Sequence, residues 1–208
     1  MYEAYYGLTV RPFQLNPDPS FYFDSTQHRR ARAYLEYGIH QNEGFIVVTG
    51  EIGAGKTTIV RGLLEVLDKE KVIAAQLVST QLDADDMLRM VAAAFGVRSK
   101  SEAKADLLLS LEAFLVDVAR QGKRCLLIVD EAQNLTPKQI KTLITRAGPG
   151  TKIICMGNLA QIDTPYLTEG SSGLTFAVDR FKGWPHGGHI TLARGERSRL
   201  ADYASDVL

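Results

Sequence analysis

The sequence has little cysteine, no net charge and no long apolar run. Its two cysteines, Cys125 and Cys155, each lie inside an aliphatic stretch, which predicts buried apolar thiols. Lys and Arg together number 24, as do Asp and Glu, so the overall charge does not indicate a strongly basic surface for nucleic acid or anionic membranes. No apolar stretch approaches the ~20 residues of a membrane-spanning helix, so we expect no transmembrane segment.

Length and composition are those of one globular domain. The chain has 208 residues, of which 45% are hydrophobic and 23% charged, so we expect a packed core and no room for two large domains. Residues 1–6 lack the basic and then apolar pattern of a secretory signal. The simplest compartment is therefore the cytoplasm.

The sequence divides into an N-terminal segment and a core domain. Residues 1–27 contain three prolines and seven aromatic side chains, which disfavour a helix but suit an arm that packs on a core. Ser25 is the expected N-cap of a helix that continues to about His40. We therefore expect residues 1–40 to be an arm and a helix packed on a domain formed by residues 41–208.

Short apolar runs in the core domain predict buried strands. There are five of them, at residues 45–49, 72–78, 124–130, 152–156 and 189–193. Helical patterns lie between most of these runs, and a strand, helix, strand succession indicates a parallel crossover connection. The predicted architecture is a three-layer α/β sandwich on a mostly parallel sheet.

A glycine-rich segment lies directly between the first predicted strand and the next helix. It fits the pattern of glycine, four residues, glycine, lysine and Ser/Thr that binds nucleotide phosphates. Glycines allow backbone N–H groups to turn toward phosphate oxygens, and the positive end of the following helix adds attraction. The alternative, a purely structural turn, does not require lysine and then threonine. The predicted nucleotide-binding residues are Gly50, Glu51, Ile52, Gly53, Ala54, Gly55, Lys56, Thr57 and Thr58.

Two side chains of this segment have specific predicted roles. We expect Lys56 to reach the β- and γ-phosphates and the hydroxyl of Thr57 to hold Mg²⁺.

Two carboxylates lie at the carboxyl end of the third predicted strand. Asp130 and Glu131 come after four apolar residues, which places them at the carboxyl edge of the sheet, where open α/β sheets bind ligands. We expect Asp130 to order Mg²⁺ through water and Glu131 to polarise the water that attacks the γ-phosphate. The alternative is an exposed acidic strand end without a catalytic role.

Glu131 directly after Asp130 is similar to the arrangement in RecA-like and AAA-type ATPases. In those families the catalytic strand lies one place away from the strand that precedes the phosphate loop. The resemblance implies a P-loop NTPase fold, a three-layer α/β/α sandwich whose five-stranded sheet has the order 5-1-4-3-2.

About two thirds of the chain carry the motifs of one family. They are Tyr5-Tyr-Gly-Leu, Arg11-Pro-Phe13, Pro17-Asp-Pro19, Tyr37-Gly-Ile39, Gly44-Phe45, Thr49–Thr58 and Val129–Leu135. Together they resemble the ExeA-type ATPases of secretion and exopolysaccharide-export systems. The resemblance implies ATP as the nucleotide, Mg²⁺ as the cofactor and secretion or exopolysaccharide-export machinery as the partner. It also extends the expected location from the cytoplasm to the periphery of the inner membrane.

A second family pattern begins at the same Asp-Glu-Ala-Gln-Asn-Leu motif and continues to the C-terminus. Its segments are Leu135–Gln139, Thr145–Gly148, Gly157-Asn158, Gln161–Tyr166, Asp179–Gly183 and Arg194–Arg199. They resemble the closing third of PhoH-like ATPases. Such a chain would have exchanged halves at the shared motif, by natural recombination, by deliberate construction or by an error in sequence assembly.

The second resemblance implies roles for further residues. Asn158 and Gln161 would sense the γ-phosphate, although turn chemistry also explains an Asn after a Gly. Gln133 would contact the attacking water or cap the strand end. Arg197, with Arg199 second, would be an arginine finger, within the chain or across the subunit contact of a homo-oligomeric ring. The alternative for these arginines is a solvated helix start.

Three functions remain open on the sequence alone. The leading hypothesis is Mg²⁺-dependent ATP hydrolysis. The second is an RNA-stimulated NTPase, which the resemblance to PhoH-like ATPases suggests together with the basic residues around the shared motif, Lys138, Lys141, Arg146 and Lys152. The third is a nucleotide-binding switch with little hydrolysis.

Overall fold

The computed structural model describes residues 2–9, 25–41, 44–78, 83–98 and 103–192. Its centre is one five-stranded sheet in the order β2-β3-β4-β1-β5, with each neighbouring pair parallel. This is the predicted strand order. The strands are β1 (Gly44–Gly50), β2 (Val72–Val78), β3 (Arg124–Asp130), β4 (Thr151–Gly157) and β5 (Gly187–Leu192).

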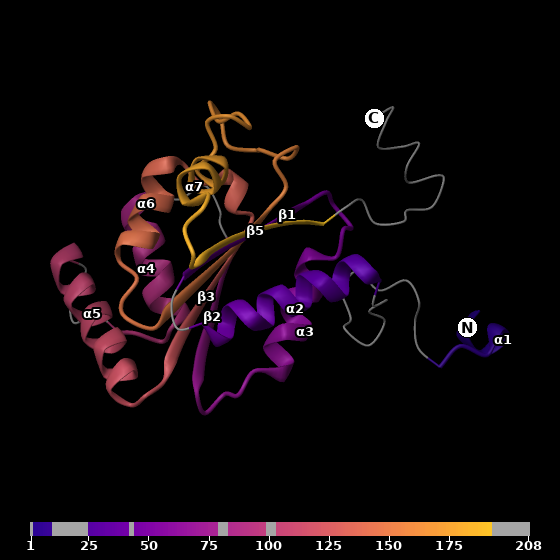
Figure 1. Ribbon diagram of the computed structural model, residues 1–208, viewed down its shortest axis with the longest axis horizontal. Coiled ribbons are helices and arrows are strands. Elements are labelled where there is room, and N and C mark those ends of the chain that lie inside the picture. The colour runs from indigo at the N-terminus through magenta and orange to yellow at the C-terminus, as the bar shows by residue number, and fades with distance from the viewer. Residues whose placement is uncertain (1, 10–24, 42–43, 79–82, 99–102, 193–208) are drawn as a thin grey trace.

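Helices cover both faces of this sheet. The described helices are α1 (Tyr2–Tyr6), α2 (Thr26–His40), α3 (Lys56–Val66), α4 (Ala84–Ala94), α5 (Lys104–Arg120), α6 (Pro137–Thr145) and α7 (Gly173–Phe181), with a 3-10 turn η2 (Ala132–Asn134). Figure 1 shows α2 and α3 on one face and α4 to α7 on the other. Among the described residues, no helix combines the length and the apolarity needed to cross a membrane.

The two faces form two separate apolar cores. Phe45 and Val47 of β1 belong to the core under α4, α5, α6 and α7, whereas Ile46 and Val48 belong to the core under α2 and α3. This alternation follows from the two-residue period of a strand. Because both faces are covered, β1 is apolar at successive positions, as buried parallel strands are. Cys125 and Cys155 are buried in these cores, as expected.

The predicted N-terminal helix is present and packs on the core. Ser25 caps α2 by accepting a hydrogen bond from the N–H of His28. Leu35 and Ile39 are buried against the sheet and α3. At the other end of α2, Arg124 Nη1 donates to the carbonyl oxygen of Ile39 at 2.9 Å. A cation in this position stabilises the negative C-terminal end of the helix dipole.

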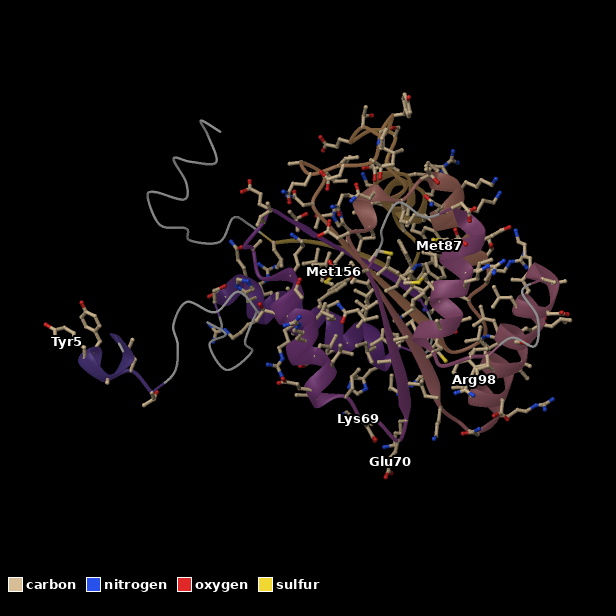
Figure 2. The ribbon with its side chains drawn as sticks, turned by 180° about the vertical axis from the view of Figure 1, so that it is seen from behind. Tyr5, Lys69, Glu70, Met87, Arg98 and Met156 are labelled. Atoms are coloured by element: carbon tan, nitrogen blue, oxygen red, sulfur yellow. The ribbon has the colours of Figure 1, made fainter. Side chains whose placement is uncertain are left out.

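Only the start of the expected arm, residues 2–9, belongs to the described residues. The short helix α1 lies away from the sheet (Figures 1 and 2), and Tyr5 is 83% exposed. Residues 4–9 are all exposed, so this stretch of the arm does not pack on the core. The remaining part of the arm, residues 10–24, lies outside the described residues.

The shared motif joins elements that pack into one core. Thr136 and Gln139 form a capping box at the start of α6, and Pro137 occupies the first helical position, which fixes where the helix begins. Ile140 and Leu143 of α6 are buried in the same cluster as residues of α4 and α5, which precede the motif. Residues from both resemblances therefore share one face of the sheet.

Candidate nucleotide-binding site

A cavity of ≈ 260 Å³ opens at the carboxyl edge of the sheet, where β1, β3 and β4 end side by side. It collects side chains and backbone from the glycine-rich loop (residues 50–57), from the end of β3 and from the end of β4. Its lining residues are Ile52, Gly53, Gly55, Lys56, Thr57, Thr58, Asp130, Glu131, Gln133, Gly157, Asn158 and Gln161. The predicted phosphate, magnesium and sensor residues thus meet in one place. Of the predicted loop residues, Gly50, Glu51 and Ala54 do not line it.

The glycine-rich loop takes its shape from two left-handed residues. Gly53 has φ 76° and Gly55 has φ 83°, conformations that side-chain-bearing residues adopt only with strain. Helix α3 begins directly afterwards at Lys56, so its positive end points at the cavity. This is the backbone geometry that the sequence pattern predicted.

Lys56 is held at the centre of the loop. Its Nζ donates to the carbonyl oxygens of Gly50 at 2.6 Å and Glu51 at 2.9 Å. Burial lowers the pKa of Lys56, and the carboxylates of Asp130 and Glu131 oppose this shift. A partly desolvated ammonium in a polar cavity is a favourable place for an anion.

Asp130 and Glu131 are linked through the backbone. The N–H of Glu131 donates to Asp130 Oδ1 at 3.0 Å, which orients the Asp130 carboxylate. Glu131 has φ 56°, a left-handed conformation that is strained for a glutamate. Strained backbone of this kind is typical of functional sites, because the surrounding structure must hold it in place.

Gln133 is buried behind these carboxylates, with only 1% of its surface exposed, and its side-chain amide bonds to three neighbouring residues. Its Nε2 donates to Glu131 Oε2 at 2.8 Å and to the carbonyl oxygen of Gln161 at 3.0 Å. Its Oε1 accepts from the N–H of Asn158 at 3.1 Å. Gly157 must lack a side chain, because a Cβ there would lie 2.7 Å from this Oε1. Gln133 therefore fixes the Glu131 carboxylate relative to the end of β4.

Asn158 and Gln161 line the cavity and also bond to one another. Asn158 Nδ2 donates to Gln161 Oε1 at 3.0 Å, and Asn158 Oδ1 accepts from the N–H of Ala160 at 3.3 Å. Asn158 therefore stabilises its own turn and also lines the cavity. Arg197 and Arg199 lie outside the described residues.

Two family profiles match the chain and overlap around the shared motif. A profile described as AAA domain matches residues 39–161, more than half of the chain. The chain belongs to the AAA domain family. A profile described as PhoH-like protein matches residues 119–204. The resemblance to two ATPase families is therefore confirmed.

Two individual relatives of this AAA domain carry the same two kinds of name. Protein PhoH2 of Bacillus subtilis is 34% identical over 202 residues, which cover 84% of this chain and 45% of that protein. General secretion pathway protein A of Aeromonas hydrophila is 37% identical over 145 residues, which cover 69% of this chain and 26% of that protein. The chain spans less than half the length of either relative.

Solved structures agree on the fold. The Aeropyrum pernix ORC2 protein in its ADPNP–ADP complexes superposes with a TM-score of 0.59 at 13% identity, covering 88% of this chain and 51% of that one. The Pif1 helicase of Candida albicans superposes with a TM-score of 0.54 at 16% identity, covering 89% and 43%. At these identities the likeness concerns the α/β P-loop architecture alone.

The cavity of this AAA domain also fits a magnesium ion. The hydroxyl of Thr57 and the carboxylate of Asp130 line it together, and Mg²⁺ is bound through few protein oxygens with waters and phosphates completing its shell. Among the described residues, no group of three or more His, Cys, Asp and Glu could hold a metal by itself. The donor set therefore suits an ion that arrives with a nucleotide.

His28 also contacts the glycine-rich loop, which no sequence pattern predicted. Its Nε2 lies 2.9 Å from the carbonyl oxygen of Ala54 in the glycine-rich loop, although 26 residues separate the two. The only local signal was the position of His28 in the first turn of α2, next to the cap Ser25. Nothing in that signal indicates contact with the loop.

One expectation about the basic residues around the shared motif is wrong. Lys152 lies on β4, between two other strands, and only 4% of it is exposed. It cannot contribute to a basic surface, because the central position of its strand buries it. Lys138, Lys141 and Arg146 are exposed.

Proposed function

We propose that this AAA domain is a Mg²⁺-dependent ATPase. The observation that carries the proposal is the meeting of Lys56, Thr57, Asp130 and Glu131 around one cavity at the carboxyl edge of the sheet. Phosphoryl transfer needs little covalent chemistry from a protein and depends on positioning and on stabilising charge. A cation, a hydroxyl and two carboxylates in one cavity match that requirement. The choice of ATP rests on the two family resemblances.

The loop and Lys56 bind the phosphates in this proposal. Backbone N–H groups of the loop and the start of α3 hold the phosphate oxygens, and Lys56 reaches the β- and γ-phosphates. Thr57 and Asp130 would hold Mg²⁺, Asp130 through water. When bound, the ion neutralises the charge that develops on the phosphate oxygens.

Glu131 acts as the general base. Its carboxylate takes a proton from the water that attacks the γ-phosphate, and the bond from Gln133 keeps Oε2 in a fixed position. Asn158 and Gln161 contact the γ-phosphate from the end of β4. An arginine finger, Arg197 first and Arg199 second, completes the charge stabilisation, in a homo-oligomer if the finger comes from a neighbouring subunit.

We propose secretion or exopolysaccharide-export machinery as the partner, and the cytoplasm or the periphery of the inner membrane as the location. The 69% of the chain that aligns with General secretion pathway protein A supports the secretion machinery.

Phosphate release by the purified chain with Mg²⁺ and ATP tests the proposal. Lys56→Ala should abolish measurable ATP binding, because it removes the cation of the loop. Glu131→Gln should keep binding while turnover falls by about 10²- to 10⁴-fold, since an amide cannot accept the proton.

Two matched controls lie at the opposite edge of the sheet. Lys69 and Glu70, labelled in Figure 2, are exposed and precede β2, whereas the cavity lies where β1, β3 and β4 end. Lys69→Ala and Glu70→Gln should therefore behave as the parent does. If Glu131→Gln hydrolyses ATP at the parental rate, Glu131 has a structural role and is not the general base. ATP binding without phosphate release by the parent would favour the nucleotide switch.

Tyr166 favours the second candidate function, RNA-stimulated hydrolysis. It is 100% exposed and has φ 67°, a strained conformation for a tyrosine. Its loop is tied to the segment after β3, because Asn134 Oδ1 accepts from the N–H of Asp163 at 2.8 Å and the Asn134 carbonyl accepts from Thr164 Oγ1 at 3.0 Å. Exposed aromatic rings stack on single-stranded bases with ~1–3 kcal/mol per base.

Single-stranded RNA in the phosphate-release assay tests this candidate. We expect RNA to raise turnover, Tyr166→Ala to lose most of that increase, and basal hydrolysis to stay unchanged. Raised salt should reduce the stimulation, because phosphate contacts release counterions. If RNA stimulates the parent and Tyr166→Ala equally, Tyr166 does not contact RNA.

A further inference from the structure

The loop carbonyl of Ala54 has a donor that comes from outside the loop. His28 Nε2 lies 2.9 Å from this oxygen, and His28 belongs to α2 and is not among the residues that line the cavity. A carbonyl oxygen only accepts hydrogen bonds, so the proton of this bond must be on Nε2. Nδ1 lies 2.7 Å from Ser25 Oγ, whose hydroxyl supplies the proton there when the ring is neutral.

The orientation of one peptide plane follows from this contact. In a trans peptide the C=O of one residue and the N–H of the next point in opposite directions. The structure has no cis peptide among its described residues. Because the Ala54 carbonyl points to His28, the N–H of Gly55 points the other way. Gly55 lines the cavity and His28 does not, so an N–H turned away from His28 points toward the cavity.

The loop needs such a constraint because its glycines are permissive. Gly53 and Gly55 both occupy the left-handed region, and glycine populates either sign of φ at little cost, so this peptide plane can rotate. Gly55 also approaches the ring closely, since a Cβ on it would lie 2.8 Å from His28 Nε2. The absence of a side chain at residue 55 thus serves the contact as well as the turn.

The opposite side of the loop is held by the loop itself. Lys56 Nζ donates to the carbonyls of Gly50 and Glu51, and the N–H of Ala54 donates to Glu51 at 3.2 Å. The Ala54 carbonyl is therefore bound by a side chain of α2, while the carbonyls of residues 50 and 51 are bound from within the loop.

From this geometry we infer that His28 is a positioning residue that orients the Ala54–Gly55 peptide so that the Gly55 N–H faces the phosphates. The inference rests on the proposed nucleotide function and extends the site to α2. His28 acts through the backbone of the loop and touches neither phosphate nor metal ligand. Loss of this hydrogen bond should weaken nucleotide binding. It should leave Asp130 and Glu131 in place, so turnover at saturating ATP should not change.

The test compares two replacements of similar size. His28→Gln places an amide N–H the same number of bonds from Cα as Nε2, whereas His28→Leu fills the space without a donor. We expect His28→Leu to weaken binding of Mg²⁺·ADP by about 3- to 10-fold, the effect of one hydrogen bond, in calorimetric titration. The KM for ATP should rise by a similar factor with kcat within about twofold, and His28→Gln should stay near the parent.

A matched control is available on the same helix. His40 is exposed at the C-terminal end of α2, and His40→Leu should leave binding, KM and kcat unchanged. Parental affinity in His28→Leu would overturn the inference, and so would an equal loss in His28→Gln, which would indicate a packing role. If the parent itself binds no Mg²⁺·ADP, the proposed function fails before the variants are compared.

A measurement on the parent keeps the inference testable if a variant does not fold. Nitrogen NMR of the His28 ring distinguishes its two neutral tautomers. The expected form carries its proton on Nε2. A neutral ring protonated on Nδ1 would contradict the bond to Ala54.

Discussion

The backbone N–H of Asn158 donates a hydrogen bond of 3.1 Å to Oε1 of Gln133, which ties the end of β4 to the turn that follows β3. The same amide group donates to Glu131 from its Nε2. A buried amide that uses both of its ends in this way has one orientation only. The position of the Glu131 carboxylate therefore depends on the end of β4.

Replacing Gln133 tests this dependence. Gln133→Leu keeps the size of the side chain but removes the donor to Glu131 and leaves the Asn158 N–H without its buried partner. We expect turnover to fall by about tenfold or more with ATP affinity within about threefold, because the base is misplaced while the loop is untouched. The unfolding free energy should also drop by about 1–3 kcal/mol. Steady-state kinetics and denaturant titration check the two effects, and parental kcat would show that Glu131 needs no such support.

Two glycines should respond in opposite ways to a methyl group. Gly62 lies inside α3 with no atom within 4 Å of an added Cβ, so Gly62→Ala should stabilise the fold by about 0.5–1 kcal/mol. At Gly173, the first residue of α7, a Cβ would lie 2.6 Å from the Thr136 carbonyl oxygen and 2.7 Å from that of Leu135. Gly173→Ala should therefore lower the free energy of unfolding by about 1–3 kcal/mol. Urea unfolding of both variants measures the difference, and equal midpoints would contradict the packing around α7.

Helix α6 should be less protected than α3 from hydrogen exchange. It follows the shared motif and packs on α4, which belongs to the other resemblance, so small mismatches in packing are expected at this contact. A mismatch of about 1–3 kcal/mol corresponds to amides that exchange roughly tenfold faster or more. Native-state exchange followed by mass spectrometry compares the two helices in one sample. Equal, strong protection would mean that the two parts pack as well as those of a single family.

Arg197 is the predicted arginine finger. A developing phosphoryl charge needs a fixed planar donor, which Arg provides and Lys does not. Arg197→Lys should then lower turnover by about a hundredfold or more with nearly unchanged ATP affinity. If the finger acts across subunits, parental activity should rise more than linearly with protein concentration. Full activity of both Arg197→Ala and Arg199→Ala would leave these side chains as surface charge.

Local patterns in the sequence determined most of the architecture and the principal site residues. The five strands and helix α2 were predictable because apolar runs, helical spacing and the cap Ser25 act over a few neighbouring residues. The glycine-rich loop was predictable for the same reason, since Gly53 and Gly55 permit a backbone that other residues resist. The order of the strands needed a family resemblance, because each strand by itself fits several neighbours.

Only the tertiary structure decided which distant residues meet. The sequence left Gln133 between two roles, and its burial between Glu131 and Asn158 depends on β3 and β4 being neighbours. Lys152 looked like a surface cation and is buried because its strand is central. His28 reaches Ala54 only because α2 packs beside the loop. Contacts of this kind arise from the packing of whole elements, and no short segment of the chain encodes them.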